Sequence, residues 1–209
     1  TRDRIISLIH KEVVPAIGCT EPMAVALATA RAKEALGTMP ERIEVLLSAN
    51  ILKNAMGVGI PGTGMIGLPI AVALGACIGR SEYQLEVLRD LTPTTLAEGK
   101  KYMQEHDIII KLKEGITEKL YIEVTCYASS ASFASLRSKA IISGSHTRFI
   151  FIENASGAIE LNCGAPSVSS PSTRCVSNES SSSSSSLSSP CDQEDIQLNL
   201  KMVHDFATE

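Results

Sequence analysis

Apolar residues recur at helical spacing through most of the first 105 residues. In residues 5–14 they fall on one face of a helix, with Asp3 as a plausible N-cap and Pro15 at the end. Residues 68–78 are apolar on every side, so this helix is expected to be buried. The predicted helices are 5–14, 22–36, 68–78, 81–91 and 93–105, with a short helical segment at 51–56.

The period changes to two in residues 43–47 and again after Asp107. Alternation of apolar and polar residues over such short runs is typical of half-buried strands. The runs 107–113 and 120–125 predict a hairpin, and further strands are expected at 140–142, 148–152 and 158–161. We therefore predict an α+β fold, in which N-terminal helices and a buried Gly-rich helix pack on a mostly antiparallel or mixed sheet that the strand at 43–47 joins.

The composition along the chain predicts a division into three segments. Residues 1–163 carry the helix and strand patterns and are expected to form the α+β domain. Residues 164–191 are rich in serine and contain too few apolar residues to offset their chain entropy, so we expect them to be disordered. Residues 192–209 again carry apolar residues at helical spacing and predict a C-terminal helix.

The composition narrows the class of protein. A net charge of −4 and the lack of a basic stripe give no reason to expect nucleic acid as a partner. The longest apolar run, 65–78, is too short and too rich in glycine for a bilayer, so no membrane association is expected. The chain opens on charged residues rather than a signal sequence, so we expect a cytoplasmic protein. The six cysteines form no CxxC pair, unlike a disulfide framework or a self-contained zinc site.

The motif at residues 18–22, Gly-Cys-Thr-Glu-Pro, precedes the longest apolar helix pattern. Thr20 suits an N-cap and Pro22 suits the first helical position. Cys19 then sits at a helix N-terminus, where free N–H groups and the helix dipole favour the thiolate, the form that attacks carbon or binds a metal. The alternative is a small buried cysteine in a tight helix–helix turn.

Residues 48–67 form a second unusual stretch, rich in glycine. Residues 57–62 match GxGxxG formally, but a helical segment intervenes after the strand and Pro61 removes an N–H group, so a nucleotide loop is the weaker interpretation. We prefer a loop whose backbone N–H groups approach a small carboxylate, with Asn50, Lys53 and Asn54 as side-chain donors. The alternative is a crowded loop whose glycines serve packing only.

His146 is flanked by small residues in 143–147, inside the strand pattern. This context favours a β-bulge that points an imidazole at a cavity. The alternative is an ordinary histidine of the core or of a sheet edge.

Three pieces of sequence, taken together and in order, carry a resemblance. They are residues 14–22 (VPAIGCTEP), residues 50–57 (NILKNAMG) with 61–64 (PGTG), and residues 144–147 (GSHT). Over about residues 4–153 the chain resembles the N-terminal half of the L-cysteine desulfidase family, which is related to the α chain of iron–sulfur L-serine dehydratase. The resemblance implies an oxygen-sensitive [4Fe–4S] lyase that converts L-cysteine to pyruvate, ammonia and sulfide without pyridoxal phosphate.

The resemblance also implies roles for individual residues. Cys19 matches the first cluster cysteine of the family. His146 and Glu21 are the candidate bases for the α-proton, although Glu21 could equally complement the helix dipole. The expected substrate-binding residues are Thr20, Asn50, Asn54, Gly62, Thr63 and Gly64. The substrate is a small amino acid, and the residues alone do not decide between cysteine and serine.

Members of that family are longer than this chain, and their remaining cluster cysteines lie in the part that it lacks. Ser145 also stands where the family usually has glycine, which could crowd the turn before His146. We therefore expect a fragment that alone neither holds a stable four-iron cluster nor turns over cysteine. The competing function is a non-catalytic small-molecule binding or regulatory module built on the Gly-rich loop. A homo-oligomer is possible, because the slim Ala-rich helix at 22–36 could pack between subunits.

Overall fold

The computed structural model describes residues 2–13, 15–129, 135–160 and 206. It divides into two compact units, one made of Thr1–Val14 with Ser167–Glu209 and the other of Pro15–Pro166. In the first unit, α1 (Arg2–Glu12) buries Ile5, and the Arg2 guanidinium lies over the Phe206 ring, 5.4 Å from its centroid. The predicted Ser-rich segment, and the predicted C-terminal helix apart from Phe206, lie outside the described residues.

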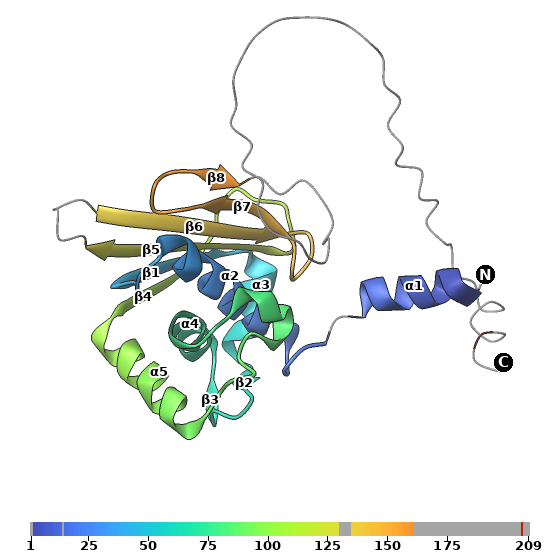
Figure 1. Cartoon of the computed structure of the whole chain (residues 1–209), viewed down its shortest axis with the longest axis horizontal. Coiled ribbons are helices and arrows are strands. Elements are labelled where there is room, and N and C mark those ends of the chain that lie inside the picture. The colour runs from blue at the N-terminus through green and yellow to red at the C-terminus, as the bar shows by residue number, and fades with distance from the viewer. Residues whose placement is uncertain (1, 14, 130–134, 161–205, 207–209) are drawn as a thin grey trace, which may run out of the picture. The chain divides into compact units, whose positions relative to one another are not determined.

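The second unit contains a helical layer and a six-stranded sheet, so the predicted α+β class is confirmed (Figure 1). Strand order is β4-β1-β5-β6-β7-β8, and every neighbouring pair is antiparallel except β1 and β4. A separate two-stranded sheet pairs β2 with β3. The elements are α2 (Thr20–Leu36), β1 (Arg42–Leu47), α3 (Ala49–Met56), β2 (Gly59–Ile60), β3 (Met65–Ile66), α4 (Leu68–Cys77), the 3-10 helix η1 (Ser81–Glu86), α5 (Pro93–Glu105), β4 (Asp107–Leu112), β5 (Tyr121–Ser129), β6 (Ser135–Ser143), β7 (Phe149–Glu153) and β8 (Ile159–Glu160).

The core lies between one face of the sheet and α2 with α4 (Figure 1). Alternate residues of β1, β5 and β6 point to this face and are fully buried, as the period of two requires. α2 lies against β5 and β6, and α4 packs on α2. A Cβ atom on Gly75 would lie 2.6 Å from the Ala26 carbonyl oxygen, so the two helix backbones approach closely at small residues. The slim helix is thus used inside this unit.

Two details of the predicted fold are wrong. The strands at 107–113 and 120–125 do not form a hairpin, because β1 lies between β4 and β5 and pairs with both. The three inward side chains of β1 are fully buried, and the central position gives them neighbours on both sides. The predicted helix at 81–91 is only a short 3-10 helix, which Gln84 interrupts with φ 49° and ψ −123°. Among the described residues, no helix has the length and apolar character needed to cross a membrane.

Candidate functional site

Cys19 lies at the start of α2. The N-cap of this helix is one residue earlier in the chain than the sequence predicted. Cys19 itself is the N-cap residue, with φ −70° and ψ 134°, and its side chain caps no backbone N–H group. The predicted N-cap, Thr20, is instead the first helical residue, and Pro22 is the third. Proline is accepted there because the first N–H groups of a helix have no intrahelical partner.

The Glu21 carboxylate gathers three neighbouring side chains, and we call these four residues the Glu21 cluster. The Cys19 thiol donates to Oε2 at 2.9 Å, and the Thr20 hydroxyl donates to the same oxygen at 3.3 Å. Asn54 Nδ2, from α3, donates to Oε1 at 3.4 Å. The structure therefore brings together four predicted site residues, one of them 33 positions away along the chain.

The electrostatics of the Glu21 cluster oppose the predicted thiolate. Burial raises the pKa of the Cys19 thiol, and its hydrogen bond to Glu21 and the negative charge of Glu21 raise it further. Hydrogen bonds from backbone groups lower it, but less. The predicted lowering of the Cys19 pKa is therefore wrong, because burial and then the hydrogen bond to Glu21 outweigh the backbone groups at the start of the helix, which do lower it.

The pKa of Glu21 shifts in the opposite direction, downward. The hydrogen bond from the Cys19 thiol is the largest cause that lowers the pKa of Glu21, and burial acts against it. The bonds from Thr20 and Asn54 lower it further. The carboxylate is thus held in its charged form by neutral donors, with no cation among the described residues in contact with it.

The Gly-rich stretch is a β-hairpin. Its turn lies directly beside residues 17–19, which lead into α2 and which we call the Cys19 turn. A Cβ atom on Gly18 would lie 2.5 Å from Cγ of Pro61, so the proline ring rests on the Gly18 backbone. Gly62 and Gly64 are exposed and have φ of 76° and 65°. No hydrogen bond from their N–H groups to another described residue is present. The binding role that the sequence predicts for this loop stays a prediction.

Thr63, predicted to bind substrate, forms hydrogen bonds within the hairpin turn in this structure. Thr63 is only 6% exposed, and its hydroxyl donates to the Ile60 carbonyl at 2.7 Å. The Thr63 hydroxyl oxygen also accepts a hydrogen bond from the Met65 N–H at 3.0 Å. Its hydrogen bonds hold the turn closed, so the side chain shapes the loop.

Asn50 and Asn54 are both exposed residues of α3. Because they are four positions apart, they lie on the same face of this helix. Asn54 reaches Glu21, whereas the Asn50 side chain makes no hydrogen bond within the described part of the chain. A residue that the sequence analysis missed, Ser48, caps α3 by accepting from the Ile51 N–H at 3.4 Å, and its place before the helical segment was the available signal.

His146 lies in the turn between β6 and β7, not inside a strand as predicted. A shift of register does occur nearby, between Ile141 and Ile142 of β6. The turn is fixed at the sheet edge by the Gly144 N–H, which donates to the Leu120 carbonyl at 3.2 Å. The imidazole is half-buried, and no hydrogen bond joins it to the Glu21 cluster in the described structure.

The His146 turn and the N-terminal end of α2 lie toward the same edge of the sheet. The C-terminal half of α2 is anchored at the other end, where the Ser138 hydroxyl of β6 donates to the Ala32 carbonyl at 2.6 Å. From Ala32 back to the first turn of α2 is about 18 Å, close to the rise of β6 from Ser138 to its end. α3 begins where β1 ends at that edge and carries Asn54 to the cluster.

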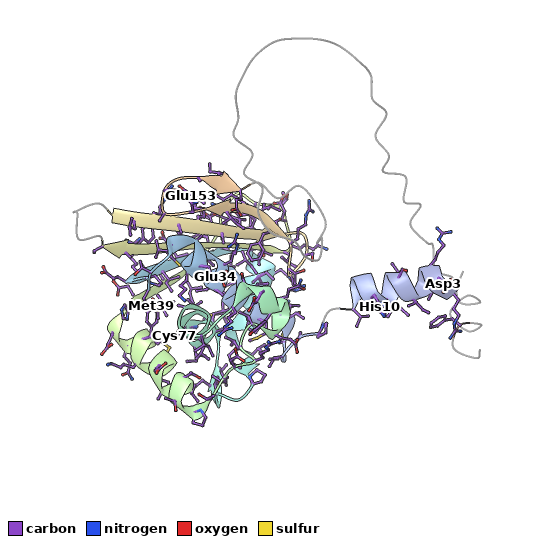
Figure 2. The ribbon with its side chains drawn as sticks, viewed as in Figure 1. Asp3, His10, Glu34, Met39, Cys77 and Glu153 are labelled. Carbon is purple, nitrogen blue, oxygen red and sulfur yellow. The ribbon has the colours of Figure 1, made fainter. Side chains whose placement is uncertain are left out.

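The described residues supply one thiol and one carboxylate to this site, from Cys19 and Glu21, and no third metal ligand beside them. No group of three or more His, Cys, Asp or Glu side chains suited to a metal is found in the described ranges. Cys126 is fully buried in β5, where burial raises its pKa to about 12. Cys77 ends α4 and lies among the helices (Figure 2). A cubane needs four such ligands, so these residues do not fit a complete cluster site.

The chain is similar to proteins named UPF0597. The UPF0597 protein of Bacteroides fragilis is 67% identical over 151 residues, which cover 72% of this chain and 34% of that protein. The relative from Phocaeicola vulgatus is 54% identical over 207 residues, covering 99% of this chain and 42% of its own. The relative from Parabacteroides distasonis is 49% identical over 208 residues, with 43% of its length covered.

This chain thus spans less than half the length of the curated relatives it matches. Their names state no activity, and none mentions L-cysteine desulfidase or L-serine dehydratase. No family model matches the chain, and no solved structure matches it.

Proposed function

We propose that this chain is the N-terminal portion of a lyase that carries out α,β-elimination on a small amino acid. The substrate would be L-cysteine, giving pyruvate, ammonia and sulfide, or L-serine, giving pyruvate and ammonia. The observation that supports this best is the Glu21 cluster, which joins Cys19, Thr20 and Asn54 to a carboxylate that contacts no cation among the residues described by the structure. A site of this kind beside free backbone N–H groups suits a zwitterionic ligand.

The two charged groups of an amino acid find separate partners here. The N–H groups of Gly62 and Gly64 are exposed donors for the substrate carboxylate. Within the described part of the chain the Glu21 carboxylate accepts hydrogen bonds from neutral groups only, so a substrate ammonium would supply a positive charge there. Asn50 lies on the same helix face as Asn54 and offers a further donor.

Elimination then needs a base for the α-proton and a group that assists the leaving sulfur or oxygen. The base takes the proton from the α-carbon, the electron pair forms the α,β double bond, and hydrosulfide or hydroxide leaves the β-carbon. The resulting enamine becomes an imine, and water converts it to pyruvate and ammonia. Glu21 and His146 remain the candidate bases, and Glu21 is the one within the cluster.

An iron–sulfur cluster would enter this site only with help from residues beyond those described. Cys19 offers one thiolate ligand, and the other ligands would come from elsewhere. We therefore assign no step of the elimination to a cluster. The same reasoning leads us to propose that this chain alone forms no stable four-iron cluster and releases no sulfide from cysteine.

The experiment compares this chain with the full-length relative from Phocaeicola vulgatus under anaerobic conditions. After reconstitution with iron and sulfide, the relative is expected to form pyruvate from L-cysteine or L-serine. Alanine at its position aligned with Cys19 is expected to abolish this. The proposal fails if the relative forms pyruvate from neither amino acid. A complete cubane in this chain alone would contradict the fragment proposal.

A second candidate function is a non-catalytic binding or regulatory module. It is favoured by the raised pKa of Cys19, which disfavours the thiolate, the reactive form of the side chain. Cys19→Ala separates the two functions in the full-length relative, at the aligned position. A binding module keeps its affinity for the amino acid after this substitution, whereas a lyase loses turnover.

A further inference from the structure

The turn that carries Cys19 is supported from one side by Pro61. A Cβ atom on Gly18 would lie 2.5 Å from Cγ and 3.0 Å from Cδ of the proline ring, so only glycine fits. Gly18 also has φ 82°, a conformation that L side chains rarely adopt. Both residues are otherwise exposed and lie outside the buried core. The contact therefore fixes the turn more than it adds to the core.

Pro61 is itself held rigidly. The Thr63 hydroxyl and N–H close the turn onto the Ile60 carbonyl, at 2.7 Å and 3.2 Å. Gly62 packs against Leu91, whose Cδ2 would lie 3.0 Å from a Cβ atom there. The proline ring has little freedom of its own, because its φ is fixed. The hairpin thus presents a stiff surface to Gly18.

The Cys19 turn is also bonded to η1. The Ile17 N–H donates to the Leu85 carbonyl at 3.2 Å. Leu85 is 3% exposed and follows Gln84, whose φ of 49° and ψ of −123° are strained for a residue with a side chain. The Cys19 turn is therefore held by two supports from distant parts of the chain.

We infer that Pro61 is a positioning residue for Cys19. Its ring holds Gly18 so that the Cys19 sulfur stays against Glu21. This inference rests on the proposed function for the role of Cys19 as the working thiol. The positioning itself is a property of the folded chain, so it can be tested without any turnover.

The test measures how fast iodoacetamide alkylates each cysteine, by peptide mass spectrometry at one pH and well below the melting temperature. Pro61→Ala removes the ring atoms nearest Gly18. We expect alkylation of Cys19 to become about fivefold faster, the factor that corresponds to loss of one ordinary hydrogen bond. Cys126, which is fully buried, reports unfolding and is expected to keep its rate. Pro93→Ala, at an exposed helix start, is the matched control and should change neither.

A pair of substitutions sharpens the test. Gly18→Ala is expected to accelerate alkylation of Cys19, because its methyl group would meet the proline ring. In the Pro61→Ala background the nearest remaining atom is Cβ, at 4.0 Å, so the same substitution should have a smaller effect. If Gly18→Ala unfolds the chain, fast alkylation of Cys126 reveals it and Pro61→Ala alone decides.

Three outcomes overturn the inference. Pro61→Ala leaves the Cys19 rate unchanged, or it accelerates Cys19 and Cys126 equally, or Gly18→Ala acts equally in both backgrounds. None of these depends on substrate. A full-length relative without lyase activity would remove the proposed function and leave this measurement as it stands.

Discussion

Two glutamates of this fold hold their charge by opposite means. Glu123 of β5 is 4% exposed and is bonded by Lys113, Lys139 and the Tyr121 hydroxyl, at 2.9, 2.6 and 2.8 Å. Glu21 is half-buried, and among the described residues its hydrogen-bond donors are all neutral, at 2.9 to 3.4 Å. Two lysines thus compensate the charge of Glu123, whereas no described cation contacts Glu21. The proposed function uses this difference, because it assigns a cationic ligand group to Glu21.

The largest expected effect is the loss of unfolding free energy on substitution of Glu123, the glutamate that is paired with lysines. Glu123→Gln leaves two lysines without their carboxylate, and the loss of a buried partner costs about 3 kcal/mol of unfolding free energy. Because side chains of Lys113 and Lys139 are 33% and 25% exposed, water reduces that cost toward about 2 kcal/mol. Glu21→Gln, the matched control, should cost less than about 1 kcal/mol. Urea unfolding of both variants measures the contrast, and equal costs would erase the distinction.

The second effect is the pH dependence of stability. Burial acts to raise the pKa of Glu123, but the bonds from Lys139, Lys113 and Tyr121 outweigh it and lower the pKa to about 2, from 4.5. The unfolded chain therefore takes up a proton first as the pH falls. The stabilisation by Glu123 is fully present above pH 4.5 and is lost between pH 4.5 and 2, by less than about 2 kcal/mol once water around the same two lysine side chains is allowed for. Unfolding of the native chain should lose this much more over that range than Glu123→Gln does, and parallel curves would contradict the account.

The sequence predicted most elements of the fold, because their periods are local. Helix α2 ends at Gly37 as expected, with φ 77°, and the buried helix became α4. Pairing between distant strands has no local signal, so the position of β1 between β4 and β5 was not predictable from the pattern. A 3-10 helix broken at Gln84 also leaves no trace in apolar spacing.

The candidate site was predicted as a set of residues but not as an arrangement. Cys19, Thr20, Glu21 and Asn54 were all singled out, and the structure joins them. The predicted direction of the Cys19 pKa shift was wrong, because the shift depends first on burial and then on the bond to the Glu21 side chain, and spacing reveals neither. The support of Gly18 by Pro61 was missed for the same reason, since 43 positions separate them in the chain.

A third, smaller effect concerns the support of the Cys19 turn. Gln84→Gly removes the strain of a side chain at φ 49°, while glycine adds flexibility to the unfolded chain. The two effects leave a net stabilisation of about 1 kcal/mol. A rise in the urea midpoint with an unchanged slope is the expected result. A destabilised variant would mean that the Gln84 side chain makes a contribution larger than its strain.

The smallest expected effect concerns Asn54, which donates a hydrogen bond to Glu21. Asn54→Ala removes one exposed hydrogen bond of 3.4 Å to Glu21. Its cost in unfolding free energy should stay below about 0.5 kcal/mol, since water replaces the lost donor. Thermal unfolding measures this. A loss several times larger would show that Asn54 is part of the structural framework rather than an accessible part of the site.

The most direct test of the central claim is a titration of the ¹⁵N-labelled chain with L-serine, followed by nuclear magnetic resonance. We expect the backbone amides of Gly62 and Gly64 and the side-chain amide of Asn54 to shift together, and Glu21→Gln to abolish these shifts. Amides of α5, which carries none of the proposed site residues, serve as the internal control. No shifts at the hairpin turn, or shifts that Glu21→Gln leaves unchanged, would contradict the claim that the Glu21 carboxylate and the Gly-rich hairpin form one binding site.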